Sequence, residues 1–173
     1  MSITKKVIAK AEGKVKLLFG AGTSNWNTKG YLNVDIRKTV TVNVVCDLSK
    51  TLPWKDNEVD KIHAESIIEH IPMGEQYVNT IKVLKEWNRV LKIGGMLTLK
   101  IPDLAALCGA YAIHSGTVIS YLYGKQDYPE NTHVAGFSIN VLKDIFSKTN
   151  FEFAGTNKPD FMPWEIEIKG KKK

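Results

Sequence analysis

Two glycines and one acidic residue near the start of the chain have the types and spacing of a ligand-binding turn. Gly20 and Gly22 follow the apolar segment 15–19, and Asp35 lies near the end of the next apolar segment, 32–36. Glycines allow the backbone to approach a ligand closely, and a carboxylate accepts hydrogen bonds from ribose hydroxyls. Two nearby glycines also occur in ordinary turns, so it is the acid after the second segment that favours an adenosine-containing ligand.

Asp47 repeats this arrangement one segment later. It follows residues 42–46, which are rich in β-branched side chains, just as Asp35 closes the segment before. Either acid alone could be a simple strand-end or turn residue. Two acids that close successive strands after a glycine turn favour a shared ligand.

Two histidines are candidates for proton transfer. His133 lies in the stretch 123–137, where polar, aromatic and glycine residues gather in a long connection of the kind that often carries function. Imidazoles titrate near neutral pH, so His133 or His70 could remove a proton from an acceptor, with a structural role as the alternative for each. His70, Asp127 and His133 match no recognised metal-ligand spacing, and no metal site is expected.

The elements that must position these residues alternate between strands and helices. Residues 75–92 are the clearest helix, because apolar side chains recur there at spacings of three or four, and Gly94-Gly95 is expected to end it. The expected strands are 15–19, 32–36, 42–46, 59–64, 96–101, 151–155 and 164–168. The other expected helices are 66–70, 104–114, 116–123 and 138–150, the last one capped by Ser138. This order predicts an α/β fold with a mostly parallel seven-stranded sheet flanked by helices and a C-terminal antiparallel hairpin.

Composition predicts one domain spanning residues 1–173. Most of the net charge of +6 comes from lysines at the two ends, and we expect residues 1–13 and 169–173 to be flexible and basic. The body of the domain is close to neutral, which argues against a nucleic-acid groove. No apolar run approaches the ~20 residues that span a bilayer. Two cysteines, Cys46 and Cys108, suit a reducing cytoplasm, and we expect a cytoplasmic monomer or homodimer without a membrane span.

The stretch 84–95 is the most specific part of the sequence. It reads Leu-Lys-Glu-Trp-Asn-Arg-Val-Leu-Lys-Ile-Gly-Gly. It resembles the helix-to-strand signature of class I S-adenosylmethionine-dependent methyltransferases of the type 11 group, in which Arg-Val-Leu-Lys-Pro-Gly-Gly is usual. Residues 59–64 and Glu69-His70-Ile71 resemble the fourth strand of that family and its continuation. The resemblance covers about residues 15–153 and implies a Rossmann-like methyltransferase fold, S-adenosyl-L-methionine as cofactor and S-adenosyl-L-homocysteine as product.

The resemblance also implies where the cofactor binds. In that family, the turn that matches Gly20-Ala21-Gly22 packs against the methionine part of the cofactor. The acid that matches Asp35 binds both ribose hydroxyls, and the pair that matches Asp47-Leu48 recognises the adenine. The implied cofactor-binding residues are Phe19, Gly20, Ala21, Gly22, Asp35, Ile36, Asp47, Leu48, Ala64 and Glu65.

The acceptor is less well defined. The stretch 123–137 resembles a loop that covers the cofactor and acceptor pocket in some relatives, which makes His133 and His70 the candidate catalytic residues. Glu65-Ser66 departs from the family, where a small polar residue and a histidine are common under the reactive end of the cofactor. Four tyrosines in or near the stretch 123–137 suggest a small-molecule or sugar-like acceptor. They are Tyr111, Tyr121, Tyr123 and Tyr128.

The expected activity is therefore methyl transfer from S-adenosylmethionine to a small-molecule or glycan acceptor. A non-catalytic protein of the same fold, which binds the cofactor or a partner as a subunit or regulator, is the first alternative. An NAD-dependent oxidoreductase is the second, and it is disfavoured because Asn25 stands where the third glycine of Gly-x-Gly-x-x-Gly would be.

Overall fold

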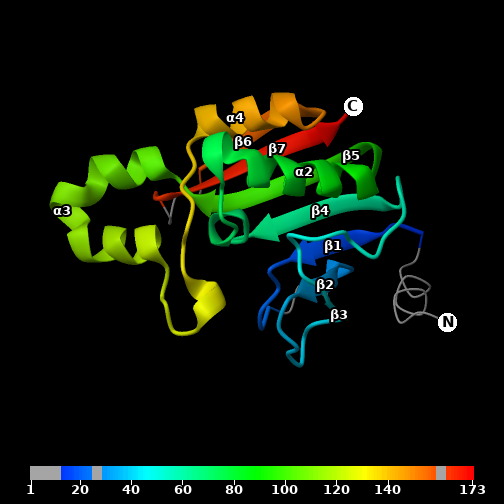
Figure 1. The fold of residues 1–173 in the computed structure, drawn as a ribbon, viewed down its shortest axis with the longest axis horizontal. Helices are drawn as coiled ribbons and strands as arrows, with labels where there is room; N and C mark the ends of the chain where they lie inside the picture. The colour runs from blue at the N-terminus through cyan, green and yellow to red at the C-terminus, as the bar shows by residue number, and fades with distance from the viewer. Residues whose placement is uncertain (1–12, 25–28, 159–162) are drawn as a thin grey trace.

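A seven-stranded sheet organises the part of the chain that the computed structural model describes, residues 13–24, 29–158 and 163–173 (Figure 1). Its strands lie in the order β3-β2-β1-β4-β5-β7-β6. Their bounds are β1 Lys16–Phe19, β2 Leu32–Asp35, β3 Val44–Val45, β4 Val59–Glu65, β5 Leu91–Pro102, β6 Phe151–Asn157 and β7 Glu165–Lys172. The first five strands pair in parallel, and β7 pairs antiparallel with both β5 and β6. The predicted α/β fold and its antiparallel C-terminal strands are confirmed.

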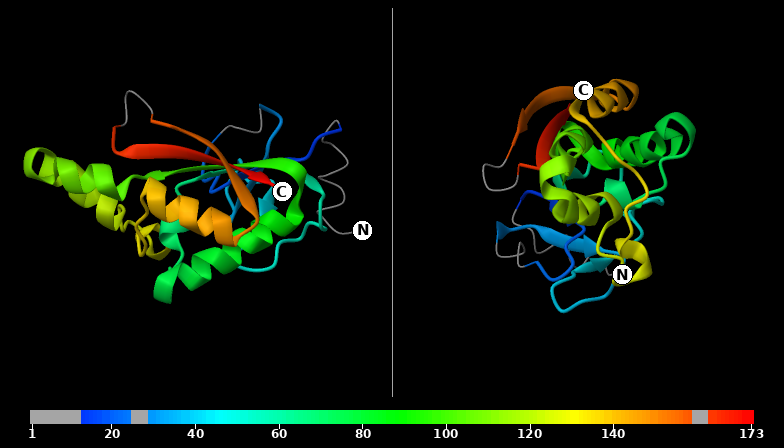
Figure 2. Two further views of the ribbon diagram at one scale, coloured as in Figure 1. Left: turned by 90° about the horizontal axis from the view of Figure 1, so that it is seen from above. Right: turned by 90° about the vertical axis from the view of Figure 1, so that its left-hand side faces the viewer.

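Three helices of the described residues accompany the sheet. They are α2 Val78–Val90, α3 Leu104–Tyr123 and α4 Ile139–Lys148, with short 3-10 turns η2 Ile68–His70, η3 Glu75–Tyr77 and η4 Pro129–Asn131. Helices α2 and α4 lie on the same face of the sheet, whereas α3 projects beyond the end of β5 (Figure 2). The segment that follows α3 and carries η4 runs back past the edge where β1, β2 and β4 end (Figure 1).

The core explains why β1 and α2 form where the sequence predicts them. Leu17, Leu18 and Phe19 are all buried, as expected for a central strand that is covered on both faces. The apolar stripe of α2 places Trp87 against Phe19, with the two rings edge to face and 4.9 Å between their centroids. The Trp87 indole donates a hydrogen bond of 3.0 Å to the carbonyl of Leu48, so this helix also fixes the loop after β3.

Several boundaries differ from the sequence prediction. The third strand has two residues instead of five, and the helix expected over 75–92 ends at Val90. Gly94 and Gly95 therefore lie inside β5 and do not end the helix. The helix stops early because Leu91 is fully buried and pairs with Val59 of β4, so pairing in the sheet outweighs the helical pattern.

The structure of the C-terminal lysines differs from the sequence prediction. Residues 169–173 were expected to be a flexible basic end, but 165–172 form β7 in the middle of the antiparallel part of the sheet. The Lys172 ammonium donates hydrogen bonds to the carbonyls of Asn88 and Leu91, at 2.7 and 2.8 Å. These carbonyls lie at the end of α2, where a cation is favourable. The other expected flexible end falls mostly on residues 1–12, which lie outside the described residues.

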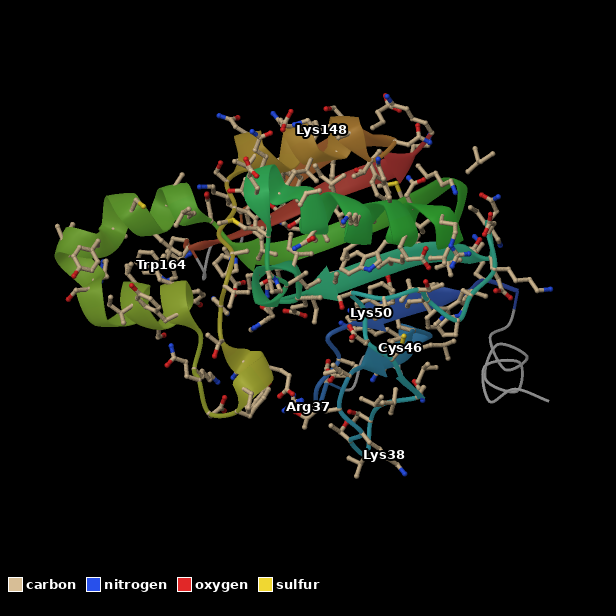
Figure 3. The ribbon with its side chains drawn as sticks, in the orientation of Figure 1. Arg37, Lys38, Cys46, Lys50, Lys148 and Trp164 are labelled. Carbon is tan, nitrogen blue, oxygen red and sulfur yellow. The ribbon has the colours of Figure 1, made fainter. Side chains whose placement is uncertain are left out.

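Helix α3 contradicts the expectation that no apolar stretch approaches the length of a membrane span. Its 20 residues carry no charged side chain and reach a mean hydropathy of 1.2, so by length and composition this one described helix could cross a bilayer. The helix is broken at His114, however, which has a non-helical φ of −128°. Two helical arms meet there, as the sequence predicted, and Trp164 lies in the angle between them (Figure 3). Each arm has about ten residues, which is half the length that a span requires.

Candidate active site

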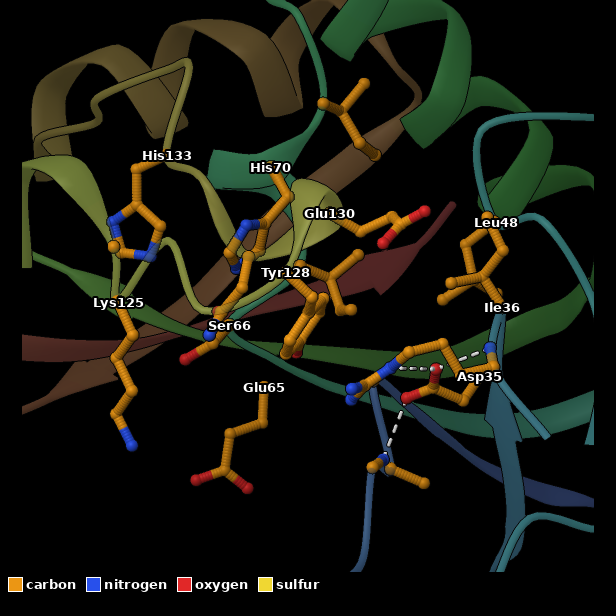
Figure 4. Close-up of a pocket in the computed structure, with 18 of the residues that line it drawn as sticks. Asp35, Ile36, Leu48, Glu65, Ser66, His70, Lys125, Tyr128, Glu130 and His133 are labelled. Carbon is orange, nitrogen blue, oxygen red and sulfur yellow. Dashed lines mark hydrogen bonds and ion pairs between the residues drawn. The ribbon is translucent and has the colours of Figure 1, made fainter. Parts of the chain in front are cut away.

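A cavity of about 1010 Å³ lies at the carboxyl ends of β1, β2 and β4, where the sequence predicted a ligand (Figure 4). Residues from the glycine turn, the ends of β2 and β4, the loop after β3, and the segment around η4 line it. Pockets for small ligands in proteins are about 300–1,000 Å³, so this volume has room for a large cofactor or for two ligands together.

The glycine turn after β1 has a shape that only glycine allows at Gly20. This residue has a φ of +73°, and a Cβ atom there would overlap the Ile67 side chain and lie 2.7 Å from the carbonyl oxygen of Glu65. The amide groups of Gly20 and Ala21 donate to the carbonyl of Val34, at 3.0 and 3.3 Å, which fastens the turn to β2. The turn therefore leaves one wall of the cavity as bare backbone.

Asp35 lies at the end of β2 and faces this turn across the cavity wall. One carboxylate oxygen accepts a hydrogen bond of 2.8 Å from the Gly22 amide, and the other accepts one of 2.9 Å from the Arg37 amide. A carboxylate has about four acceptor positions, so two remain available to a ligand. Only 6% of the residue is exposed, and any hydrogen bond made there is shielded from water.

Arg37 is a cavity residue that the sequence did not single out. Its guanidinium forms an ion pair with Asp35 at 3.7 Å and lies over the Tyr128 ring, 4.0 Å from the ring centroid. Figure 3 shows its side chain between β2 and the segment that carries η4. Because Tyr128 is more than 90 residues further along the chain, no local pattern could have revealed this contact.

Ile36, Asp47 and Leu48 form the next part of the wall. Ile36 is 48% exposed, and Leu48 is buried with its carbonyl held by Trp87. One Asp47 oxygen accepts hydrogen bonds from the amide and hydroxyl of Ser49, at 2.9 and 2.7 Å. Two apolar side chains beside a carboxylate suit a flat aromatic group with hydrogen-bond donors at its edge.

Three of the predicted contact residues have other roles in this structure. Phe19 and Ala64 are buried in the core behind the cavity and do not line it. Glu65 does line the cavity, but its carboxylate forms an ion pair of 2.7 Å with Lys100. Lys100 also pairs with Glu165 of β7 at 3.1 Å, so β7 helps to fix the end of β4.

His70 and His133 lie together at the opposite end of the cavity from Asp35 (Figure 4). Their rings meet edge to face, with 4.7 Å between centroids. The Nδ1 atom of His70 is 3.1 Å from the carbonyl oxygen of Thr132, and that of His133 is 2.7 Å from the carbonyl oxygen of Tyr121. Burial lowers the pKa of both imidazoles, which favours their neutral forms.

Glu69, next to His70 in η2, is another residue that the sequence did not single out as functional. Its carboxyl group is buried, and burial raises its pKa to about 8. Its backbone carbonyl accepts hydrogen bonds from the amides of Val134 and Ala135, at 2.8 and 3.1 Å, which ties the loop of His133 to η2. Asp127, which the sequence analysis grouped with the two histidines, instead contacts Asn131 on the exposed side of that loop.

Part of the sequence matches a known family of proteins. Residues 25–99 match the family model described as a methyltransferase domain. The matched segment spans less than half of the chain. No curated protein sequence matches the chain.

Solved structures of methyltransferases share the fold of this chain. An S-adenosylmethionine-dependent methyltransferase of Thermotoga maritima, described as a possible histamine N-methyltransferase, is 21% identical, covers 99% of this chain and 88% of its own, and has a TM-score of 0.66. A second one, from Mesorhizobium loti, is 10% identical over 99% and 98% of the two chains, with a TM-score of 0.64. The methyltransferase CalH in complex with S-adenosylhomocysteine is 12% identical over 96% and 53%, with a TM-score of 0.62. At these identities the likeness establishes the class I methyltransferase fold.

Proposed function

We propose that this chain is a methyltransferase that binds S-adenosylmethionine in the cavity and transfers its methyl group to a small-molecule or glycan acceptor. The observation that carries the proposal is the pairing of Asp35 with the glycine turn. A shielded carboxylate with two free acceptor positions lies beside bare backbone at the carboxyl end of a parallel sheet. The domain match and the fold of the S-adenosylmethionine-dependent neighbours support it.

The residues present fit this cofactor. The turn Gly20-Ala21-Gly22 would receive its amino-acid portion, and Asp35 would accept hydrogen bonds from both ribose hydroxyls. Ile36 and Leu48 would pack against the two faces of the adenine, with Asp47 at its edge. When bound, the cofactor supplies an electrophilic methyl group on a sulfonium centre.

The chain itself must orient the acceptor, exclude water and accept a proton where the acceptor is a hydroxyl. A backbone carbonyl only accepts hydrogen bonds, so the contact with Tyr121 places the proton of the neutral His133 ring on Nδ1. Its Nε2 atom then carries the lone pair and can accept a proton. The same argument applies to His70 through Thr132, so either histidine can serve as the base.

The size and lining of the cavity support a small or sugar-like acceptor. Tyr121 and Tyr128 line it, whereas Tyr111 is an exposed residue of α3 and does not. Hydrogen-bonding tyrosines in a cavity of this volume suit a polar small molecule. The proposed setting is the cytoplasm, where Cys46 and Cys108, both free thiols, stay reduced, and the proposed assembly is a monomer or homodimer.

Transfer of a labelled methyl group from S-adenosylmethionine to small molecules and glycans of a cell extract tests this function. The wild-type protein is expected to label an acceptor. The His133→Ala variant is expected to bind S-adenosylhomocysteine normally and to lose about 10²–10⁴-fold in turnover. His114→Ala is the matched control, because that histidine lies at the kink of α3, away from the cavity. Cofactor binding without any transfer would favour the non-catalytic alternative.

A further inference from the structure

Three side chains at the acceptor end of the cavity converge in a way that cofactor binding does not require. Glu69 and His70 come from η2, and His133 comes from the loop after η4. One potential ligand atom from each of the three lies within 4.8 Å of those of the other two. Residues 63 positions apart in the sequence thus meet at one point, at the side of the cavity away from Asp35.

Each of the two histidines has one ring nitrogen held in the way that metal-bound histidines have. Each ring has its Nδ1 atom against a backbone carbonyl, which fixes the proton on Nδ1 and leaves the Nε2 lone pair free. Histidines that bind metals almost always donate their other ring N–H to a carbonyl or a carboxylate in this way. Both rings also line the cavity, so a ligand bound to them would be accessible from it.

Glu69 supplies the third observation. The residue is only 2% exposed, and neither carboxylate oxygen has a hydrogen bond of normal geometry with the described residues. The Ser66 hydroxyl and the Ile67 and Glu69 amides lie near this carboxyl group. A buried carboxylate without a charged partner is costly, and coordination to a cation is one of the few ways to stabilise it.

We propose that Glu69, His70 and His133 bind one divalent transition-metal ion between them. Two imidazoles and one carboxylate are a ligand set of zinc, iron and related ions, and are harder to reconcile with Mg²⁺ or Ca²⁺, which prefer oxygen ligands. Ligand atoms on one tetrahedral zinc ion are about 3.4 Å apart, as Zn–N and Zn–O distances of about 2.1 Å require. Small side-chain rotations would bring atoms within 4.8 Å to that spacing.

Three protein ligands leave a coordination position open, as in catalytic metal sites. That position would face the cavity, because His70 and His133 line it. An oxygen or nitrogen atom of the acceptor would fill it, which would orient the acceptor toward the cofactor. With the ion bound, the Nε2 lone pairs would be occupied, and the ion in place of a histidine base would favour loss of the acceptor proton. This role for the ion rests on the proposed function, whereas the ion site itself does not.

Equilibrium dialysis and calorimetric titration of the metal-free protein with Zn²⁺ test the site, with Co²⁺ as a coloured probe. The wild-type protein is expected to bind about one equivalent and to give the intense visible absorption of tetrahedral or five-coordinate Co²⁺. Glu69→Gln and His70→Ala are each expected to weaken binding by about 100-fold or more. The control variants His114→Ala and Asp127→Asn are expected to bind as tightly as the wild type.

A second measurement does not depend on the folding of the variants. Zn²⁺ is expected to protect His70 and His133 of the wild-type protein from diethylpyrocarbonate, while the exposed His114 is modified at the same rate with and without the ion. The proposal is overturned if the wild type binds no stoichiometric Zn²⁺, or if the variants and the protection pattern show that these residues are not involved. Titration with S-adenosylhomocysteine on the same samples separates this outcome from failure of the proposed function, because cofactor binding involves Asp35 and not this cluster.

Discussion

At the scale of single residues, Asp35 has both a structural and a proposed binding role. Its carboxylate orders the glycine turn through the Gly22 amide and still has acceptor positions for a ligand. The sequence predicted the turn and the acid because both depend on local chemistry, a glycine conformation and a strand-end carboxylate. Arg37 and Glu69 could not be found in this way, since their importance comes from Tyr128 and His133, which are distant in the sequence.

Replacing Gly20 with alanine tests the shape of the turn. A Cβ atom at this position would overlap Ile67 and the Glu65 carbonyl, and the φ of +73° disfavours any side chain. We expect Gly20→Ala to lower the free energy of unfolding by about 1–3 kcal/mol. We also expect it to weaken S-adenosylhomocysteine binding. Chemical denaturation measures the first effect and calorimetry the second.

Gly109 provides the matched control for that experiment. It lies in α3, and a Cβ atom there would meet nothing within 4 Å. Gly109→Ala is expected to leave both stability and ligand binding intact or to raise stability slightly, because alanine favours a helix. Equal effects of the two substitutions would contradict the steric account of the turn.

At the scale of elements, α2 positions the side of the cavity that Asp47 and Leu48 line. Arg89 near its end forms ion pairs of 2.6 Å with both Glu86 and Asp56. The Arg89 guanidinium also donates hydrogen bonds to the carbonyls of Leu52 and Trp54, at 3.3 and 3.0 Å. The helix therefore holds the loop that follows Asp47 and Leu48. The sequence predicted the helix, its buried stripe and the family signature that includes Arg89, but not these contacts with the loop.

Replacing Arg89 with methionine tests this link and its pH dependence. Hydrogen bonds from Arg89 are the main cause that lowers the pKa of Glu86 below its usual value of 4.5. A carboxyl group with a lowered pKa in the folded state adds stability above the unfolded-state pKa and loses it as the pH falls through the folded-state value. We expect Arg89→Met to cost about 1.5–3 kcal/mol at pH 7, and the difference from the wild type to shrink below about pH 4.

Denaturant unfolding of both proteins from pH 3 to 8 measures that difference. A constant difference across this range would show that the Glu86 carboxylate does not contribute. Lys85→Met is a suitable control, since Lys85 is an exposed residue of the same helix. It is expected to change stability by less than about 0.5 kcal/mol.

The last strand gives a second prediction at this scale. Because Lys172 donates to carbonyls at the end of α2, we expect Lys172→Met to destabilise the fold by about 1–2 kcal/mol. Lys171→Met, at an exposed neighbouring position, is expected to have no measurable effect. Thermal unfolding of the two variants distinguishes them. Equal melting temperatures would favour the flexible basic end that the composition suggested.

Local patterns predicted most elements but not their ends. The apolar stripe of α2 and the cap at Ser138 were sufficient to predict two helices. In the structure, Ser138 accepts a hydrogen bond from the Val141 amide. The end of α2 depends on the pairing of Leu91 with Val59, and β7 depends on its position between β5 and β6. Such long-range pairing overrides a lysine-rich composition or a continued helical pattern, and a single sequence does not display it.

At the scale of the whole molecule, the sheet brings distant segments to one edge. Strands β1, β2 and β4 end at the same edge. The segment around η4, which comes much later in the sequence, covers that edge (Figures 1 and 4). The sequence predicted this edge as the binding site because parallel strands place ligands beyond their carboxyl ends. It did not predict the separation of a carboxylate end from a histidine end within the cavity, which arises from the fold of the loop 123–137.

This separation supports the proposal that Asp35 and the glycine turn bind the cofactor. Calorimetric titration with S-adenosylhomocysteine, compared between the wild type, Asp35→Ala and His133→Ala, tests it most directly. We predict one site in the wild type, an affinity about 10–100-fold weaker in Asp35→Ala because charged hydrogen bonds are lost, and little change in His133→Ala. A wild-type protein that binds no S-adenosylhomocysteine, or an Asp35→Ala variant that binds it as tightly as the wild type, would contradict the claim.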